Sequence, residues 1–274
     1  MNSILRPFHY LLIAGLMIVS ILPSVAQTKI TPSAKKKKLI WKEEFNYKGL
    51  PDSTKWDYET GFVRNKEKQY YTRARIENSY VKKGKLVIES KKEKYKDAEY
   101  TSASINTLGK QHFSGDFRIE IRAKLPFGKG IWPALWMMGS NRPQVGWPKC
   151  AEFDIMEFVG HTPSTVYGTF HWWDSEAVKP NTHKSKGNNV KLDDIHEKYH
   201  VYGLEREGDK ITVFIDKNYY FSMSAPATAY KDSFTSPVYL LINTAIGGSW
   251  GGEIDDSIFP QKFYVDYIRV FQLK

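Results

Sequence analysis

Short alternations of apolar and polar residues recur along this chain, and they limit the possible folds more than any other pattern in it. Residues 117–126 read Phe-Arg-Ile-Glu-Ile-Arg-Ala-Lys-Leu-Pro. Such alternation places one face of a β-strand in a core and the other in solvent. Gly- and Pro-rich turns separate these segments, residues 174–196 are predicted to be a long polar surface loop, and helical periodicity is almost absent. We therefore predict an all-β jelly-roll sandwich of two curved antiparallel sheets with a concave outer cleft.

The first 26 residues have the features of a cleavable export signal. Arg6 supplies the positive region, and residues 11–22 form an apolar run that is too short to span a membrane comfortably. Small residues at positions 24–26 suit cleavage. We therefore predict a signal peptide over residues 1–26, no membrane span, and a secreted or periplasmic mature protein.

The remaining chain is predicted to hold a Lys-rich linker over residues 27–38 and one domain over residues 39–274. The net charge of +10 would suit an acidic partner, but part of it comes from the run Lys35–Lys38, which reads most simply as a solvated segment. No nucleic-acid-binding motif accompanies this run, so no nucleic-acid partner is predicted. The only cysteine, Cys150, allows no intramolecular disulfide. We expect a monomer.

One apolar segment carries three acidic residues close together. Residues 151–159 read Ala-Glu-Phe-Asp-Ile-Met-Glu-Phe-Val, which is typical of a buried strand apart from its acids. In a regular strand Glu152 and Asp154 would share one face and Glu157 would lie on the other. A β-bulge at either of the two residues between Asp154 and Glu157 would return Glu157 to the face of the first two.

The spacing of these acids leaves more than one interpretation open. A solvated strand face explains it as well as an active site does. A metal site is less consistent, because no Gly-punctuated loop with calcium-ligand spacing surrounds the acids. Retaining glycosidases use two carboxyl groups about 5–5.5 Å apart. The bulge is therefore a hypothesis that glycosidase chemistry would require.

The neighbouring segments favour the glycosidase interpretation. Trp132-Pro133-Ala134-Leu135-Trp136 lies upstream of the acids, Gly146-Trp147-Pro148 leads into them, and Gly160-His161 follows. Together with the Glu-x-Asp-x-x-Glu pattern of residues 152–157, these segments resemble glycoside hydrolase family 16, especially its laminarinase-like endo-β-1,3-glucanases. The resemblance extends from about residue 39 to residue 272.

This resemblance implies a secreted retaining endo-β-glycosidase that needs no cofactor for its chemistry. Glu152 would be the nucleophile, Glu157 the general acid and then the base. Asp154 would lie between them, where its charge helps to keep Glu157 protonated. The implied substrate is a laminarin-type β-1,3-glucan, with mixed-linkage β-1,3-1,4-glucan as a further candidate. An endo-hydrolase of an anionic algal galactan such as agar or porphyran, and a non-catalytic lectin-like protein, remain alternatives.

The resemblance also implies the residues that contact the glycan. Some match a loop that lines the cleft, and others offer flat aromatic faces on which sugar rings stack. A histidine and a tryptophan on the strand after the acids complete the set. The predicted substrate-binding residues are Asn65, Gln69, Tyr71, Trp132, Trp136, His171, Trp172 and Trp250.

Three positions need separate comment. Ser104 stands where laminarinase-like members commonly have Arg, which removes a cation facing the cleft and leaves the subsite preference open. Arg206 stands where many members have Trp, and we interpret it as a change on the outer face. Asp266 is an acid in an otherwise apolar and aromatic run. The resemblance implies a structural calcium on the convex side, held by Asp266 with backbone groups near Glu44 and Gly84. A plain salt bridge from Asp266 to Arg269 or to a Lys is the alternative.

Overall fold

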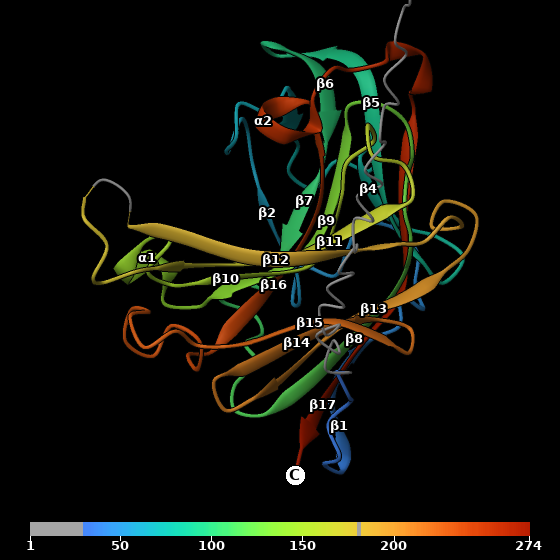
Figure 1. The fold of residues 1–274 in the computed structure, drawn as a ribbon. Helices are drawn as coiled ribbons and strands as arrows, with labels where there is room; N and C mark the ends of the chain where they lie inside the picture. Colours follow the sequence, from blue (N-terminus) through green and yellow to red (C-terminus); the bar gives the residue numbers. More distant parts are fainter. Residues whose placement is uncertain (1–29, 180–181) are drawn as a thin grey trace, which may run out of the picture.

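Two β-sheets packed face to face make up most of the structure (Figure 1). This computed structural model describes residues 30–179 and 182–274, so the predicted export signal lies outside the described residues. Within those ranges the helical segments are α1 (Arg142–Val145), α2 (Gly248–Gly251) and the 3₁₀ turn η1 (Asp256–Ile258). No described helix is long and apolar enough to cross a membrane. The predicted all-β sandwich is confirmed.

The larger sheet has ten strands. Its main path runs in the order β15-β14-β13-β8-β17-β5-β6-β3, with β1 paired to β17 and β4 paired to β5. The short pair β3·β6 is parallel. The strands are β1 (Lys37–Glu43), β3 (Gln69–Tyr71), β4 (Ser79–Val81), β5 (Leu86–Tyr95), β6 (Ala98–Ser102), β8 (Phe117–Lys124), β13 (His200–Glu207), β14 (Lys210–Ile215), β15 (Asn218–Ser224) and β17 (Gln261–Leu273).

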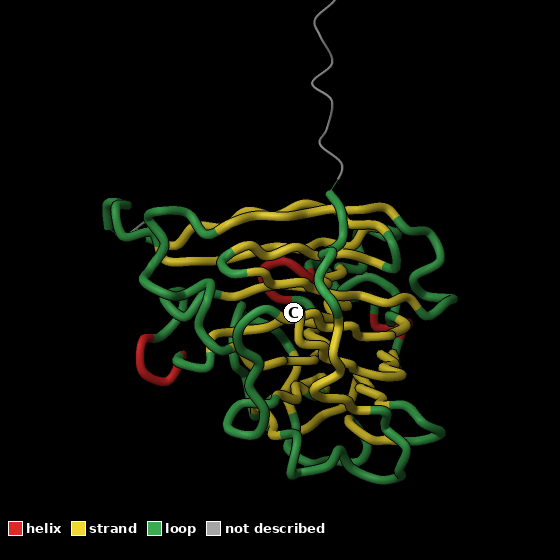
Figure 2. The backbone as a smooth tube through the Cα atoms, turned by 90° about the horizontal axis from the view of Figure 1, so that it is seen from below, coloured by secondary structure: helices red, strands yellow, loops and turns green. Residues whose placement is uncertain are grey.

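The smaller sheet has seven strands in the order β12-β11-β10-β9-β16-β7-β2. In Figure 1 its strands β10, β11, β12 and β16 lie as one layer across the layer of β8, β13, β14 and β15, and Figure 2 shows the strands from below, joined by loops at their ends. The strands are β2 (Asp57–Glu59), β7 (Ser104–Asn106), β9 (Ile131–Gly139), β10 (Glu152–Phe158), β11 (Thr165–Trp173), β12 (His183–Lys191) and β16 (Val238–Ile246).

The main core lies between the two sheets and consists of the apolar members of the alternating strands. On β10, Phe153 packs edge-to-face against Phe170 of β11 and against Phe234, with ring centres 5.5 and 5.2 Å apart. All three side chains are at most 1% exposed. Burying a side chain of this size contributes roughly 1.5–3 kcal/mol. This packing holds the smaller sheet rigidly from beneath, so its opposite face can carry a precisely placed site.

The predicted long surface loop over residues 174–196 is wrong, because it contains β12. That strand pairs with β11 along its whole length, from Thr165 opposite Lys191 to Trp173 opposite His183. Its sequence is polar, and nearly all of its residues are exposed, as at a sheet edge. An edge strand exposed on both faces shows no apolar alternation, so its sequence does not reveal it. The ladder to β11 alone makes this segment a strand.

The end of the predicted linker is part of the folded domain. β1 begins at Lys37, two residues before the predicted start of the domain. The backbone N–H of Lys36 donates to the carbonyl of Lys274 at 3.0 Å, and Lys35 forms an ion pair with Asp116. The lysine run is therefore partly anchored to the sheet edge, rather than solvated throughout.

The interpretation of Arg206 as an outer-face residue is also wrong. Its side chain is 1% exposed and lies over the ring of Phe117, 4.8 Å from the centroid. The guanidinium donates to the carbonyls of Gly115 at 3.0 Å and Ser236 at 2.7 Å. Burial lowers the pKa of Arg206 to about 10. A long amphipathic side chain thus fills an interior site and satisfies two loop carbonyls.

Candidate active site

The strand β10 carries the three acids, and its pairing with both neighbours is interrupted between the second and the third. Against β11, the three steps from Asp154 to Glu157 match two steps of the partner. Against β9, the two steps from Asp154 to Met156 match one. One residue is therefore inserted, and Ile155 and Met156 are both buried in the core. The predicted β-bulge is present.

The bulge brings all three acids to one pocket on the face of the smaller sheet that points away from the core. Its volume is about 370 Å³. Glu152, Asp154 and Glu157 all line it, so the extra residue has the effect that the sequence pattern predicted. The other lining residues are Arg64, Asn65, Glu67, Trp132, Ala134, Trp136, Trp147, Thr169, His171, His183, Asn243, Ala245 and Trp250.

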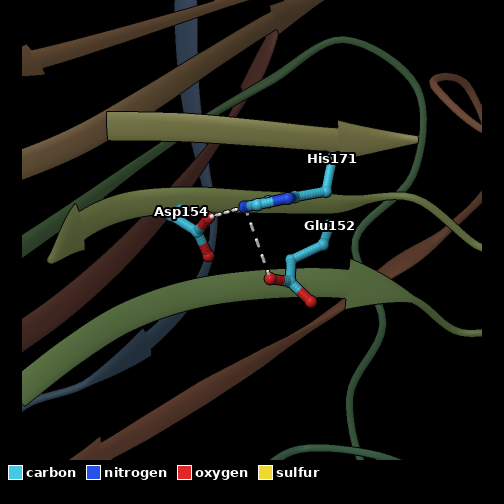
Figure 3. Close-up of side chains that lie close together, drawn as sticks. All are labelled: Glu152, Asp154 and His171. Atoms are coloured by element: carbon cyan, nitrogen blue, oxygen red, sulfur yellow. Dashed lines mark ion pairs between the residues drawn. The ribbon is translucent and has the colours of Figure 1, made fainter. Parts of the chain in front are cut away.

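A histidine from the neighbouring strand joins the first two acids (Figure 3). His171 is directly opposite Glu152 in the β10·β11 ladder. Its Nε2 lies 3.2 Å from Oδ2 of Asp154 and 3.8 Å from Oε1 of Glu152. On its other side, Nδ1 is 2.9 Å from Nε2 of His183, which reaches the pocket from β12. Glu152, Asp154 and His171 each offer one ligand atom, and these three atoms lie within 4.8 Å of one another, so they could also hold a metal ion.

Burial dominates the electrostatics of the acids. It raises the pKa of Glu152 to about 7, helped by the charge of Asp154 and opposed by His171 and Arg64. Burial also raises the pKa of Asp154 well above its ordinary value. For Glu157, burial is again the larger cause of a strongly raised pKa and the charge of Asp154 the second. Protonation of Glu157 near neutral pH thus depends first on desolvation, and less on the neighbouring charge that the sequence argument used.

The two tryptophans of β9 line the pocket, but they present little of their rings to it. Trp132 is 9% exposed; its Nε1 donates to Oε1 of Glu157 at 3.0 Å, and its ring meets the edge of Trp250, 5.4 Å between centres. Trp136 is 5% exposed, and its Nε1 donates to Oδ1 of Asn243 at 2.7 Å. Both rings therefore act through hydrogen bonds and packing more than as open stacking platforms.

Two of the three predicted loop residues lie beneath the pocket instead of lining it. Asn65 lines it, whereas Gln69 and Tyr71 are fully buried. All three donate to the carboxylate of Glu67, at 3.2 Å from Asn65, 2.7 Å from Gln69 and 3.2 Å from Tyr71. Tyr71 also accepts a 2.9 Å hydrogen bond from Asn243 of β16. This network fastens the loop to the smaller sheet.

The prediction for Trp172 is wrong. Successive residues of β11 alternate between its faces, so the outward position of His171 turns Trp172 into the core, where it packs near Phe234. The same alternation, applied strictly to the sequence, would have excluded it. Sequence reasoning also assigned no site role to Arg64, Glu67, Trp147 or Asn243, which all line the pocket. Only Trp147 gave a signal there, through the Gly-Trp-Pro segment.

The three predicted calcium-site residues lie together, at a hollow that shares no lining residue with the pocket of the acids. Glu44, Gly84 and Asp266 line one hollow, and their oxygens are of the kind that calcium prefers. Three basic side chains share this hollow: Lys85 and Arg122, which pair with Asp266, and Arg269, which pairs with Glu44. The oxygens therefore fit calcium in kind. Of the salt-bridge alternative, the pairing of Asp266 with a Lys is present, whereas Arg269 pairs with Glu44 instead.

A sandwich that gathers three carboxyl groups in one pocket across a β-bulge fits the class of glycoside hydrolases, which act with a pair of carboxyl groups. Comparison with known proteins agrees. The model of glycosyl hydrolases family 16 matches residues 66–269. The chain is 40% identical over 247 residues to a β-glucanase of Rhodothermus marinus, covering 85% of each chain.

Solved structures give the same answer. The X-ray structure of the laminarinase from Rhodothermus marinus superimposes with a TM-score of 0.80 at 38% identity, covering 88% of this chain and 100% of that one. A laminarinase from Flavobacterium sp. UMI-01 gives 0.75 at 42% identity, covering 86% and 100%. The chain belongs to glycosyl hydrolases family 16 and is similar to its laminarinases. It is an endo-1,3-β-glucanase-like retaining hydrolase, which sets aside the lectin-like alternative. Hydrolases of this family need no cofactor.

Proposed function

We propose that this protein hydrolyses laminarin-type β-1,3-glucan by double displacement through a glycosyl-enzyme intermediate. The observation that carries the proposal is the bulge in β10, which gathers Glu152, Asp154 and Glu157 in one pocket. A solvated acidic strand would have no reason to insert a residue and desolvate three carboxyl groups, because each buried charge costs free energy.

In the first step Glu157 is the general acid. Its raised pKa keeps a proton on the carboxyl group, and the indole N–H of Trp132 holds that group in place. One carboxylate oxygen of Glu152 attacks the anomeric carbon as the glycosidic C–O bond breaks, and the proton of Glu157 passes to the leaving oxygen. His171 and Arg64 favour the ionised form of Glu152 that this attack needs.

In the second step Glu157, now a carboxylate, takes a proton from water. That water attacks the anomeric carbon, the bond to Glu152 breaks, and Glu157 regains its proton. Each step inverts the configuration of the anomeric carbon, so the product retains the configuration of the substrate. Oδ2 of Asp154 lies 3.2 Å from Nε2 of His171. Asp154 orients Glu152 by sharing a proton with its carboxyl group.

The experiment is reducing-end release from laminarin, lichenan, agarose and porphyran. The catalytic control is Glu152→Gln, and the matched surface control is Glu197→Gln at an exposed position. We expect release from laminarin that is abolished by Glu152→Gln and unaffected by Glu197→Gln. Release from a galactan alone would retain the mechanism and overturn the substrate. Undiminished activity of Glu152→Gln would overturn the assignment of the nucleophile.

We propose further that the protein is exported, on the strength of the signal-like residues 1–26. Terminal sequencing of protein from the periplasm and the medium should find a chain that starts at Gln27. A cell-associated chain that retains Met1 would contradict this proposal.

We also propose that calcium binds the hollow of Glu44, Gly84 and Asp266 weakly. The ion must compete with Lys85 and Arg122 for Asp266, so millimolar calcium is needed, as in other weak extracellular sites. Thermal unfolding should shift upward with millimolar calcium, and Lys85→Met should lower the concentration required. Saturation at micromolar calcium, or no shift at all, would contradict this competition.

A further inference from the structure

Arg64 occupies an unusual position in the pocket. Its guanidinium lies over the ring of Trp136, 4.9 Å from the centroid, and it forms an ion pair with Glu59. The side chains of Arg64 and Glu59 are only 21% and 12% exposed. An arginine over an aromatic face covers surface on which a sugar ring would otherwise stack. The pocket thus has a guanidinium over a ring that the sequence predicted to be open to sugar.

Ser104 also contacts the ion pair of Arg64 and Glu59. Its hydroxyl donates to Oε2 of Glu59 at 2.6 Å, while Nη2 of Arg64 donates to Oε1. Ser104 is fully buried and does not line the pocket. Although Ser104 stands where relatives commonly have Arg, the pocket still contains a cation, because Arg64 from the preceding loop lines it. Glu59 thus has a partner on each oxygen, and its Oε1 anchors Nη2 of Arg64.

Most hydrogen-bond donors of Arg64 have no protein acceptor. A guanidinium has five N–H groups. Among residues 30–179 and 182–274, the bond from Nη2 to Glu59 is the one hydrogen bond that the side chain donates. The unpaired nitrogens of Arg64 are not among the buried side-chain atoms that lack a partner, so they stay accessible at the pocket, where a ligand or water can accept from them. This incomplete set of partners indicates a ligand rich in hydrogen-bond acceptors.

We propose that Arg64 is a specificity-determining residue that donates hydrogen bonds to the hydroxyl groups of a neutral glucan and disfavours sulfated polysaccharide. This inference rests on the proposed function and refines its substrate class. Glu59 neutralises the guanidinium, so little net charge is left to attract a sulfate group. Four carboxyl groups, those of Glu67 and of the three acids of β10, line the same pocket, and any of them that ionises repels an anionic chain. Neutral hydroxyl groups need no net positive charge for binding, and the carboxylates do not repel them.

The test is calorimetric titration of laminarihexaose and of a porphyran oligosaccharide into Glu152→Gln, which removes turnover. In this background Arg64→Met keeps an apolar stem on Trp136 but has no donors. We expect it to weaken laminarihexaose binding about tenfold or more, as the loss of hydrogen bonds from a charged donor implies. Arg64→Lys keeps the charge without the planar fork, so it should lie between Met and Arg.

A matched control is available in Arg73. It pairs with Asp57 at 2.7 Å and lies over Tyr58, 6.0 Å from the ring centre, but it does not line the pocket. Arg73→Met should leave binding within about twofold of the parent. Glu59→Gln frees the charge of Arg64, so it should raise affinity for the porphyran oligosaccharide relative to laminarihexaose.

The outcomes separate this inference from the proposed function. If the Glu152→Gln parent binds laminarihexaose and both Arg64 variants bind it equally well, the inference fails and the function stands. If the parent binds laminarihexaose but the wild type releases no reducing ends, the function fails and the Arg64 comparison still decides the inference. Binding of porphyran alone overturns both. Melting curves identify a variant that has not folded, and the laminarihexaose affinity of the remaining Arg64 variant then decides whether the inference holds.

Discussion

Replacing Glu152 with Gln is expected to abolish activity and, at neutral pH, to stabilise the fold. The physical reason is the environment of the carboxyl group, whose side chain is 18% exposed among other acids. Burial, with the charge of Asp154, raises its pKa from 4.5 to about 7. A carboxyl group with a raised pKa in the folded state favours unfolding wherever the unfolded chain has ionised and the folded one has not.

The size and sign of the effect follow from these values. Below pH 4.5 both states hold the proton, and Glu152 has no effect on stability. Between about pH 4.5 and 7 the unfolded chain releases the proton first, so the free energy of unfolding falls. Above pH 7 both states are ionised and the loss is constant. The interval from 4.5 to about 7 corresponds to roughly 3 kcal/mol, or roughly 6–12 °C in Tm for a domain of this size.

Chemical unfolding followed by tryptophan fluorescence would measure this effect at pH 4.5 and at pH 8. Glu152→Gln should match the wild type at the lower pH and exceed it by up to about 3 kcal/mol at the higher one. Asp154→Asn should change in the same direction, because burial raises that pKa too. The exposed Glu197→Gln should show no such difference. A gain that is equal at both pH values, or a loss at pH 8, would refute the reasoning.

Three further predictions concern single residues. Glu157→Gln should lower turnover on laminarin by roughly 10²–10⁴ but much less on an aryl glycoside whose phenol leaves without a proton; equal losses on both substrates would argue against an acid role. Trp147, 46% exposed in the pocket, should stack on sugar, so Trp147→Ala should raise KM roughly three- to tenfold, and an unchanged KM would contradict this. Arg206→Met should cost on the order of 3 kcal/mol in chemical unfolding, because the carbonyls of Gly115 and Ser236 lose their donors, while kcat of the folded fraction stays unchanged; a neutral effect on stability would contradict it.

The sequence by itself was enough to predict the fold class and the β-bulge that gathers the three acids on one face. Alternating strands such as residues 117–126 have a period that one half-buried sheet face imposes, so they can be read without neighbours. The bulge could be predicted because two faces and three acids leave a single consistent arrangement if the acids act together. Both are local properties of the chain, and both are confirmed.

Only the tertiary structure decided how residues distant in sequence share the pocket. The strand β12 exists because β11 offers it a ladder, and it brings His183 to the imidazole of His171. Arg64 and Trp136 lie 72 positions apart, and the fold places the guanidinium on the ring. Local patterns determine which face a side chain occupies. Which partner lies across from it, and hence its pKa and its free donors, depends on contacts that only the packed sheets create.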